Sequence, residues 1–485
     1  MRKLLVVLLG AWSTIAFGQG TWSNQVAVSA PGFSNARPRI ALMADNSPIV
    51  MWGDDVSSIV YTASWNGSSF DAPVRVHSTG TEAFTSYWAG PDIAAHGDTV
   101  YIGLAILPEI MHGMYSVRSV DGGQTWEDTV RIDNLPNGQT RFPTVAVNDD
   151  GHPVYAYMVY DDMMMDPQYH VSTSSDWGIT FGADVNGTGQ AAGEVCDCCP
   201  ANVQIEGDRQ VLTFRNNEVN LRETWVAISD DGGATFPNTK RVDTTGWTIN
   251  ACPSIGPDAL LNGDMLTTVF MSRGTAVAKV YVSETDVTNF GIDYMSMLKT
   301  ADTVTEQSNY IRVAGGDNVM AAVWQYTEWG NPNIYMTFSS TGAAGLVDNI
   351  DTANSSSSSL VLSPDIAYAD GVFHVIWKDN DSGVVMYRTL EVPYVPATGI
   401  EDGRGDLLNF SASPNPFSES TIIRFDNPEN ELFELEIYDI AGRIQRKQSV
   451  KMSSVEISAD ELKPGTYIYV LSGSNKTGRG KLMVQ

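Results

Sequence analysis

The sequence predicts an all-β protein in which a four-stranded sheet recurs along the chain, followed by a small separate β-domain. Three observations predict this: an eight-residue motif returns at a fixed interval, a proline-led strand returns at nearly the same interval, and the composition changes near residue 393. A regular interval of this size indicates a repeat architecture, in which each unit buries its apolar face against the next. The 485 residues suffice for such an array and one further domain.

The recurring motif reads Ser-x-Asp-x-Gly-x-Thr-aromatic. Its copies begin at residues 119, 174 and 229, so successive copies lie 55 residues apart. The Asp-x-Gly core favours a tight turn, because the aspartate can accept hydrogen bonds from the backbone ahead and glycine adopts positive φ. The residues before each copy alternate as in a β-strand. We therefore expect the motif aspartates to stabilise turns rather than to catalyse. They are Asp121, Asp176 and Asp231.

A second repeat, upstream of the motif, is a proline that opens a short apolar strand. Each opener is followed by a turn and a longer apolar strand, then by two more strands. Four strands per repeat form the blade of a β-propeller. Seven repeats predict seven blades, and the merging of two weak repeats would leave six. The openers are Pro38, Pro91, Pro143, Pro200, Pro253 and Pro364, with a proline-free member at 310–313.

The last repeat lacks a recognisable fourth strand, whereas an additional strand stands at the N-terminus, at Thr21–Ser29. If this strand pairs with the last blade, the ring closes and no strand edge is left exposed. We therefore expect the N-terminal strand to complete the last blade.

The eight-residue motif resembles the Asp box of sialidase-like β-propellers, which joins the third and fourth strands of a blade at its rim. The resemblance implies that the motif aromatics Trp126, Phe181 and Phe236 pack between blades. Sialidases clamp a substrate carboxylate with three arginines, whose guanidinium forks match it. They also use an aspartate as acid/base and a tyrosine as nucleophile. The candidates implied here are Arg37, Arg215, Arg222 and Arg273 for the clamp, and Asp54 or Asp55 for the acid/base.

The start of the first strand and the loop between the second and third strands lie on the same face of a blade. Ring closure would gather these segments around one end of the axis. The residues that the openers place there are Arg37, Arg39, Arg141, the segment 196–199, Cys252 and Arg312.

The four cysteines are Cys196, Cys198, Cys199 and Cys252. The pairs Cys199-Pro200 and Cys252-Pro253 occupy equivalent places in consecutive repeats, so we expect them side by side. In an exported protein this favours disulfides, with a Cys199–Cys252 bridge as the pairing that the register prefers. The alternative is a copper or zinc site, because thiolates and thioethers select soft metals.

Further candidate ligands fall on the same face as the cysteines. They are Met111, His112, Met114, Met163 and His170. The acidic loops also allow calcium, although no spacing typical of an EF-hand is present.

The two ends of the chain carry export signals. Residues 1–18 have a basic start, an apolar run and small residues, as in a secretory signal peptide. The propeller is expected over 19–392, a linker over 393–406 and the C-terminal domain over 407–485. Four motifs in the last part resemble the type A C-terminal sorting domain of the type IX secretion system, a small Ig-like β-sandwich. They are SPNPF, IYDIAGR, LKPGTYIYVL and GKLMV. The resemblance implies the type IX machinery as a partner and a secreted or outer-surface location.

The net charge of −28 opposes binding to nucleic acid or to anionic membranes. No stretch has the length and apolarity of a membrane span. An anionic small ligand remains compatible with this charge if arginines cluster in a cleft. Three functions follow: a propeller that binds extracellular glycan or protein ligands, an exo-α-sialidase-type glycoside hydrolase, or a Cys/Met-rich metal-handling or redox surface protein.

Overall fold

The computed structural model divides the chain into two compact units, Met1–Tyr394 and Val395–Gln485. It describes residues 20–392, except for 33, 110–112, 136–138, 162, 290, 299–306, 317–318, 329, 348–349 and 355–359. In the second unit it describes residues 410–484, except for 426, 428–430, 440–442 and 474–476. The predicted signal peptide and linker lie outside the described residues.

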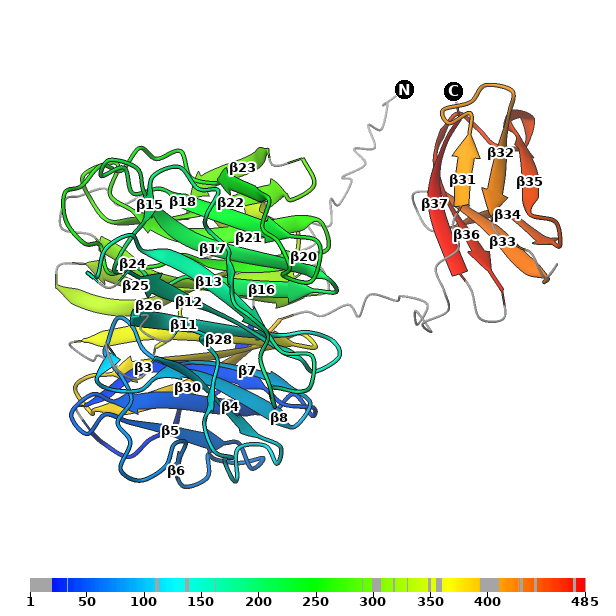
Figure 1. Ribbon diagram of the computed structural model, residues 1–485. Helices are drawn as coiled ribbons and strands as arrows, with labels where there is room; N and C mark the ends of the chain where they lie inside the picture. The colour runs from blue at the N-terminus through cyan, green and yellow to red at the C-terminus, as the bar shows by residue number, and fades with distance from the viewer. Residues whose placement is uncertain are drawn as a thin grey trace, which may run out of the picture. The chain divides into compact units, whose positions relative to one another are not determined.

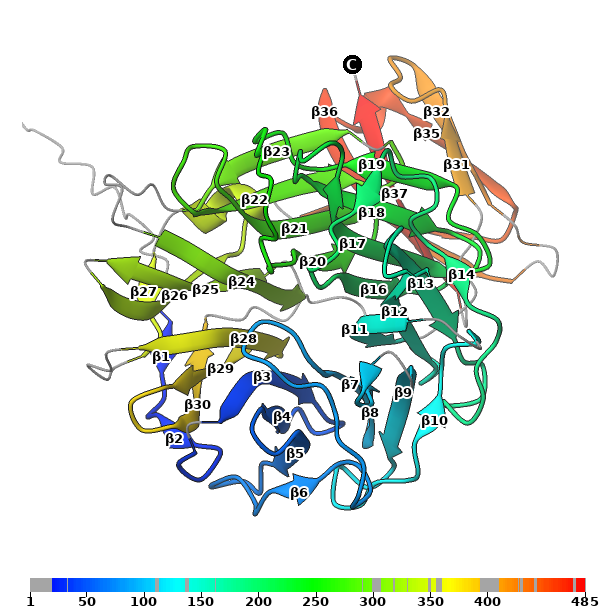
Figure 2. The same ribbon diagram turned by 60° about the vertical axis from the view of Figure 1, so that its left-hand side comes forward.

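The first unit consists of antiparallel sheets arranged around an axis, which are numbered here as blades 1 to 7 (Figures 1 and 2). Blade 1 contains β3 (Asn35–Leu42), β4 (Pro48–Asp54), β5 (Ile59–Ser64) and β6 (Val74–Arg75). Blade 2 contains β7 (Asp92–His96), β8 (Thr99–Ala105), β9 (Met114–Ser119) and β10 (Val130–Arg131). Blade 3 contains β11 (Gln139–Val147), β12 (Pro153–Tyr160), β13 (Gln168–Thr173) and β14 (Val185–Asn186).

Blade 4 contains β16 (Asn202–Glu206), β17 (Arg209–Asn217), β18 (Thr224–Ser229) and β19 (Asn238–Arg241), with β15 (Glu194–Val195) also paired to β17. Blade 5 contains β20 (Asp258–Asn262), β21 (Met265–Ser272), β22 (Lys279–Asp286) and β23 (Ile292–Met297). Blade 6 contains β24 (Gln307–Gly316), β25 (Val319–Glu328), β26 (Asn331–Ser339) and β27 (Asp351–Thr352). Blade 7 contains β28 (Val361–Ala369), β29 (Val372–Asp379) and β30 (Val384–Glu391).

The ring is closed. The first strands of the blades contact one another in cyclic order, from β3 through β7, β11, β16, β20, β24 and β28 back to β3, and they surround the axis in Figure 2. The N-terminal strands β1 (Thr21–Trp22) and β2 (Val26–Ala27) pair with β30 of blade 7. The segment Thr21–Ser29 therefore completes the last blade, as its sequence predicts.

The first strands share a local distortion at the axis. In blades 1, 3, 6 and 7 a β-bulge in the first strand shifts the register of its pairing with the second strand. One residue in each bulge has positive φ. These residues are Arg37 (φ 44°), Phe142 (φ 55°), Tyr310 (φ 50°) and Ser363 (φ 49°). A bulge re-aims the side chains beside it, which here lie at the axis.

The opener of blade 5 differs from the prediction. Strand β20 begins at Asp258, so Pro257 rather than Pro253 precedes it. A contact between blades fixes this strand start. The Asp258 carboxylate accepts a hydrogen bond from Val313 N (2.9 Å) in blade 6. Gly256 precedes Pro257 and lies against Pro200 of blade 4. It must be glycine, because a Cβ there would lie 1.7 Å from the Pro200 carbonyl oxygen in blade 4.

The apolar core lies between neighbouring blades. The motif aromatics take part in it as expected: Trp126 packs on the core shared by blades 1 and 2, and Phe181 on that of blades 2 and 3. Phe236 is buried in the core of blades 3 and 4.

The second unit is a β-sandwich. One sheet contains β31 (Phe410–Ser413), β32 (Ser420–Phe425) and β35 (Ser454–Ser458). The other contains β34 (Ile444–Val450), β33 (Phe433–Asp439), β36 (Gly465–Ser472) and β37 (Thr477–Val484) in that order. Their inner faces form one core, with Ile423, Leu435 and Leu471 fully buried. No described segment of either unit is a helix with the length and hydropathy needed to cross a membrane.

Candidate functional site

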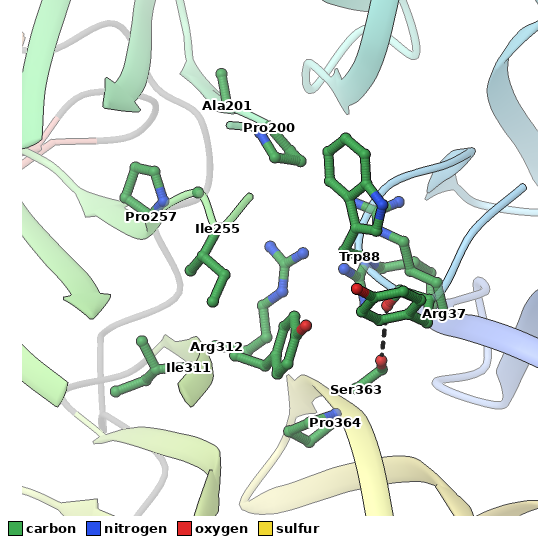
Figure 3. A pocket seen from close by; sticks show the side chains of 14 residues that line it. Arg37, Trp88, Pro200, Ala201, Ile255, Pro257, Ile311, Arg312, Ser363 and Pro364 are labelled. Atoms are coloured by element: carbon green, nitrogen blue, oxygen red, sulfur yellow. Dashed lines mark hydrogen bonds between the residues drawn. The ribbon is translucent and has the colours of Figure 1, made fainter. Parts of the chain in front are cut away.

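The first strands meet around a small cavity of about 30 Å³ on the axis (Figure 3). Its described lining contains three arginines and no carboxylate. The arginines are Arg37, Arg39 and Arg312, and the aromatic residues beside them are Tyr87, Trp88 and Tyr310. In Figure 3 the Arg312 guanidinium points into the space between Ile255 and Trp88.

Arg37 is 6% exposed and is held by the backbone of blade 2. Its Nη1 donates to the carbonyl oxygens of Gly90 (3.0 Å) and Pro91 (2.5 Å). Burial and the nearby cations Arg39 and Arg312 hold its pKa well below the ordinary value. The Nε atoms of Arg37 and Arg39 are buried without a hydrogen-bond partner. Such donors favour the entry of an acceptor group.

Arg39 and Arg312 also line an adjoining cavity of about 220 Å³, together with three aspartates, Asp92, Asp258 and Asp365. Arg312 lies 3.2 Å (Nη1) from Asp258 Oδ1 and 3.8 Å (Nε) from Asp365 Oδ1. Burial alone would lower the pKa of Arg312, but these carboxylates outweigh it and raise that pKa. For Arg39, which lies 3.8 Å from Asp92, burial prevails and lowers the pKa to about 10.

The same aspartates join consecutive blades. Each accepts a backbone hydrogen bond from the first strand of the next blade: Asp92 from Val145 N (3.3 Å), Asp258 from Val313 N (2.9 Å) and Asp365 from Ile40 N (3.0 Å). The aspartates thus fix the ring and the arginines together.

The remaining predicted clamp arginines do not line this cavity. Arg215 is fully buried in blade 4, and its guanidinium donates to the carbonyl oxygens of Ile255, Arg222 and Met271 at 2.7–3.1 Å. Arg222 is buried beside it, and Arg273 is exposed. The structure therefore gathers Arg37 with Arg39 and Arg312 instead. The sequence offers one sign of this grouping. Arg39 and Arg312 occupy the same place in their repeats, two residues after the positive-φ residues Arg37 and Tyr310.

The predicted acid/base residues also lie outside the cavity lining. Asp54 Oδ1 accepts hydrogen bonds from Val56 N and Ser57 N (both 3.0 Å), which closes the turn after β4. Its partial burial would raise its pKa, but these hydrogen bonds outweigh that and lower it. Asp55 is exposed.

The three motif aspartates make the same contacts in blades 2, 3 and 4, between the third and fourth strands. Each Oδ1 accepts from the serine hydroxyl (2.7–2.8 Å) and from the threonine N (2.8–2.9 Å), and each Oδ2 accepts from the threonine hydroxyl (2.5–2.6 Å). Asp121, Asp176 and Asp231 therefore stabilise turns.

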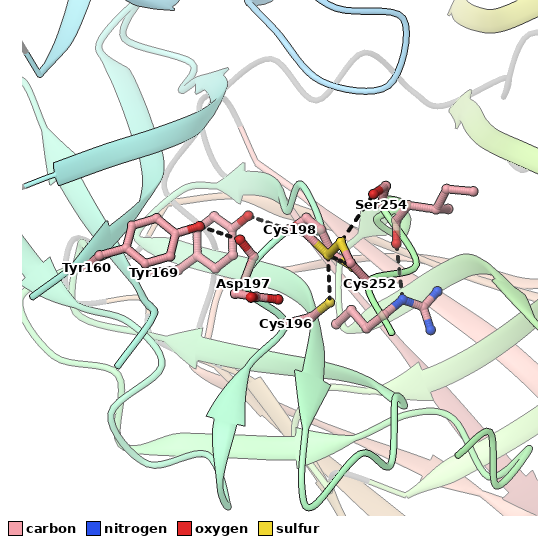
Figure 4. Close-up of a disulfide and its surroundings, with 10 residues drawn as sticks. Tyr160, Tyr169, Cys196, Asp197, Cys198, Cys252 and Ser254 are labelled. Atoms are coloured by element: carbon pink, nitrogen blue, oxygen red, sulfur yellow. Dashed lines mark hydrogen bonds between the residues drawn. A yellow bond between two sulfur atoms is a disulfide. The ribbon is translucent and has the colours of Figure 1, made fainter. Parts of the chain in front are cut away.

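The cysteines form one cluster beside the cavity (Figure 4). Cys198 is bonded to Cys252, whereas Cys196 and Cys199 are buried free thiols. The predicted Cys199–Cys252 bridge is wrong. Asn202 and Asp258 begin equivalent strands, so Cys252 lies six residues before that place and Cys199 only three, and Cys252 reaches Cys198 instead.

The other predicted metal ligands that the structure describes lie in different surroundings. Met114 is fully buried in the core between blades 2 and 3, and Met163 is 78% exposed. His170 Nδ1 lies 2.6 Å from Asp184 Oδ2. Met111 and His112 lie outside the described residues. Within the described part of the chain, the groups of His, Cys, Asp and Glu close enough to share an ion consist of the four cysteines and Asp197. A copper or zinc site at the cysteines and a calcium site in the acidic loops stay predictions from the sequence.

The C-terminal unit also matches a known family. Residues 411–485 fit the family model described as a secretion system C-terminal sorting domain. This unit is a type IX sorting domain. The sorting domain implies contact with the type IX machinery and export of the chain to the cell surface or beyond.

The propeller in front of the sorting domain is similar to several solved β-propellers. A Trypanosoma rangeli sialidase is 10% identical (TM-score 0.43; 95% of this chain and 88% of that chain covered). PorZ, a surface component of the type IX secretion system of Porphyromonas gingivalis, is 10% identical (TM-score 0.41; 95% and 60% covered). A Fusarium graminearum GH93 α-L-arabinofuranosidase is 10% identical (TM-score 0.44; 76% and 98% covered). No curated protein matches the sequence.

Proposed function

We propose that this protein is an extracellular binding protein whose propeller holds the anionic group of a ligand, such as the carboxylate of a glycan, in the axial cavity. The observation that carries the proposal is the lining itself. The described lining brings Arg37, Arg39 and Arg312 together without a carboxylate, in a chain with a net charge of −28, and the aspartates that partner Arg39 and Arg312 line the adjoining cavity instead. Positive charge concentrated in a cleft attracts anions even when the protein as a whole repels them.

The shape and chemistry of the cavity support the binding of a small anionic group. A volume of about 30 Å³ admits one small group rather than a whole sugar, so only the anionic group of a ligand enters, between apolar walls and a few oriented polar groups. Here Trp88, Tyr87 and Tyr310 supply aromatic walls. The guanidinium groups supply planar donors that match a carboxylate.

Binding is favoured over glycoside hydrolysis because the described lining offers no acid. A hydrolase of the sialidase type needs a carboxyl group that donates a proton to the leaving oxygen. Asp54 is instead a turn-stabilising carboxylate with a lowered pKa, and it lies outside the lining.

A calorimetric panel of sialylated, uronate-containing and neutral oligosaccharides tests the proposal. We expect saturable binding of one acidic class, and a loss of at least tenfold in affinity in Arg312→Gln. Arg273→Gln, which changes an exposed arginine, is the matched control and should bind like the parent protein. Equal affinity for neutral glycans, or no effect of Arg312→Gln in a folded variant, would contradict the proposal. Turnover of a fluorogenic sialoside would favour the hydrolase instead.

A further inference from the structure

The cysteine cluster places a dithiol against a disulfide. Cys196 and Cys199 have Cys-x-x-Cys spacing and are free, whereas Cys198 between them is bonded to Cys252. The Cys196 Sγ lies 3.7 Å from the Cys198 Sγ, and the Cys199 Sγ lies 4.0 Å from the same atom. These are near-contact distances for sulfur, so either thiol can reach the disulfide through a side-chain rotation.

The turn that carries the three sulfur atoms is fixed by its surroundings (Figure 4). Cys199 N donates to the Cys196 carbonyl oxygen (3.2 Å), which closes the turn. The Tyr169 hydroxyl donates to the Cys199 carbonyl oxygen (2.7 Å), and the Tyr160 hydroxyl donates to that of Asp197. The dithiol is therefore held in position before any reaction.

The charges around the cluster favour a thiolate at Cys196. A thiolate, not a thiol, attacks a disulfide. Burial alone would raise the pKa of Cys196, but a hydrogen bond from Cys199 and the charges of Arg215 and Arg222 bring it below the usual value. Arg222 is 6% exposed, and its Nε and Nη1 atoms have no hydrogen-bond partner. Burial raises the pKa of Cys199, which keeps its proton.

Cys252, the second cysteine of the disulfide, is well placed to act as the leaving group. Cys252 is exposed, and its Sγ lies 3.2 Å from the Ser254 hydroxyl oxygen. This hydroxyl can donate to a departing thiolate. A stabilised leaving thiolate accelerates thiol–disulfide exchange.

We propose that the four cysteines form a thiol–disulfide exchange centre, in which the buried Cys196/Cys199 pair passes two electrons to the exposed Cys198–Cys252 pair. The Cys196 thiolate attacks the Cys198 Sγ, the Cys198–Cys252 bond breaks, and Cys252 leaves as a thiolate. Cys199 then attacks the Cys196 Sγ, the Cys196–Cys198 bond breaks, and the Cys199 proton passes to the released Cys198 sulfur, which lies 4.0 Å away. The products are a Cys196–Cys199 disulfide and a reduced pair at the surface, without any external oxidant.

The substrate class is the disulfide of an exported protein. The Cys252 thiolate attacks one sulfur of that disulfide, and Cys198 resolves the mixed disulfide. The Cys198–Cys252 bond re-forms and the substrate leaves as a dithiol, so each chain reduces one disulfide with the two electrons of its buried pair. Export through the sorting domain brings the centre to a compartment where disulfides persist.

Alkylation of the full-length protein without reductant tests the exchange. The native protein is incubated with iodoacetamide and quenched in acid, and its cysteines are mapped by fragment-ion mass spectrometry. We expect Cys252 to become alkylated although it starts in a disulfide, together with the appearance of a Cys196–Cys199 disulfide. Cys196→Ser should slow the alkylation of Cys252 at least tenfold, because the attacking sulfur is gone.

Cys199→Ser is the matched control, because it removes a buried thiol of the same turn and leaves the first attack possible. Cys252 should still be alkylated in that variant. Alkylation of Cys196 and Cys199 alone, with Cys198–Cys252 intact in the native protein, would overturn the proposal without the use of any variant. Stoichiometric zinc or copper with all four sulfur atoms unreactive would overturn it as well. Glycan binding is measured separately, so the failure of either proposal leaves the other untouched.

Discussion

The contacts at the rim of the propeller recur from blade to blade, whereas the residues at its axis vary. At the rim, blades 2, 3 and 4 repeat one set of hydrogen bonds around Asp121, Asp176 and Asp231 with nearly the same distances. At the axis, the residue before each opener changes between blades, and only glycine is used in two of them. Those residues are Arg37, Gly90, Phe142, Cys199, Gly256, Tyr310 and Ser363.

The difference follows from the range of the contacts. Each rim turn is closed by residues at most four positions apart, so copying the sequence copies the structure. The axial contacts join residues of different blades, such as Asp365 and Ile40, which are 325 positions apart. An axial position can therefore change alone, provided that its neighbours in space accommodate it. Both proposed sites lie at or beside the axis, where this divergence is greatest.

Gly256→Ala should have the largest effect on stability. The added Cβ would lie 1.7 Å from the Pro200 carbonyl oxygen, a backbone atom that cannot move without separating blades 4 and 5. We expect the free energy of unfolding to fall by about 3 kcal/mol. Urea unfolding followed by tryptophan fluorescence measures it, and the signal reports the propeller because Trp377 is the last tryptophan of the chain.

The rim supplies the control for this change. Gly232 has φ 71°, but a Cβ there meets no atom within 4 Å. Gly232→Ala should cost about 1 kcal/mol from the backbone conformation alone. If the rim and axis variants lost equal stability, the proposed tightness of the axis would be wrong.

Asp365→Ala should have the next largest effect. Its carboxylate accepts from Ile40 N where blade 7 meets blade 1, and it lies 3.8 Å from Arg312. Removal of this carboxylate leaves the Ile40 N–H group buried without its acceptor and takes a negative charge away from the buried Arg312. We therefore expect the free energy of unfolding to fall by about 2 kcal/mol. Asp365→Asn keeps an oxygen acceptor and should lose about half as much. Equal losses in the same urea experiment would show that the hydrogen bond to blade 1 contributes little.

This contrast also explains what the sequence could predict. The 55-residue interval, the turn aspartates and the N-terminal closing strand are visible because they depend on local patterns and on periodicity. The sequence predicts Pro253 as an opener because its neighbours resemble those of other openers. The hydrogen bond from Val313 N to Asp258 that fixes the real register joins two blades and has no local signal.

The same limit applies to the predicted site. Arg215 has the residue type and the loop position of a clamp arginine, yet its guanidinium is surrounded by carbonyl groups of Ile255, Arg222 and Met271. Its role is decided by how three segments pack, which composition does not reveal. Arg312 could be placed on the axial face because it occupies an opener, but its convergence with Arg37 and Arg39 required the closed ring.

The smallest expected effect is an acid-dependent loss at the rim. Hydrogen bonds from Thr180 and Thr235 lower the pKa values of Asp176 and Asp231 to about 2. Because the folded-state pKa lies below the unfolded value, this stabilisation is present above about pH 4 and is lost as the pH falls toward about 2. In the double variant Asp176→Asn/Asp231→Asn, these two side chains cannot ionise. At pH 4 the variant should therefore unfold at a lower urea concentration than the parent protein. The two urea midpoints should converge toward pH 2, where the parent carboxylates become protonated and resemble the amide in charge. A gap that stays constant between these pH values would mean that the turns depend on the shape of the side chain rather than on its charge, and the rim would then resemble the axis in being held by packing.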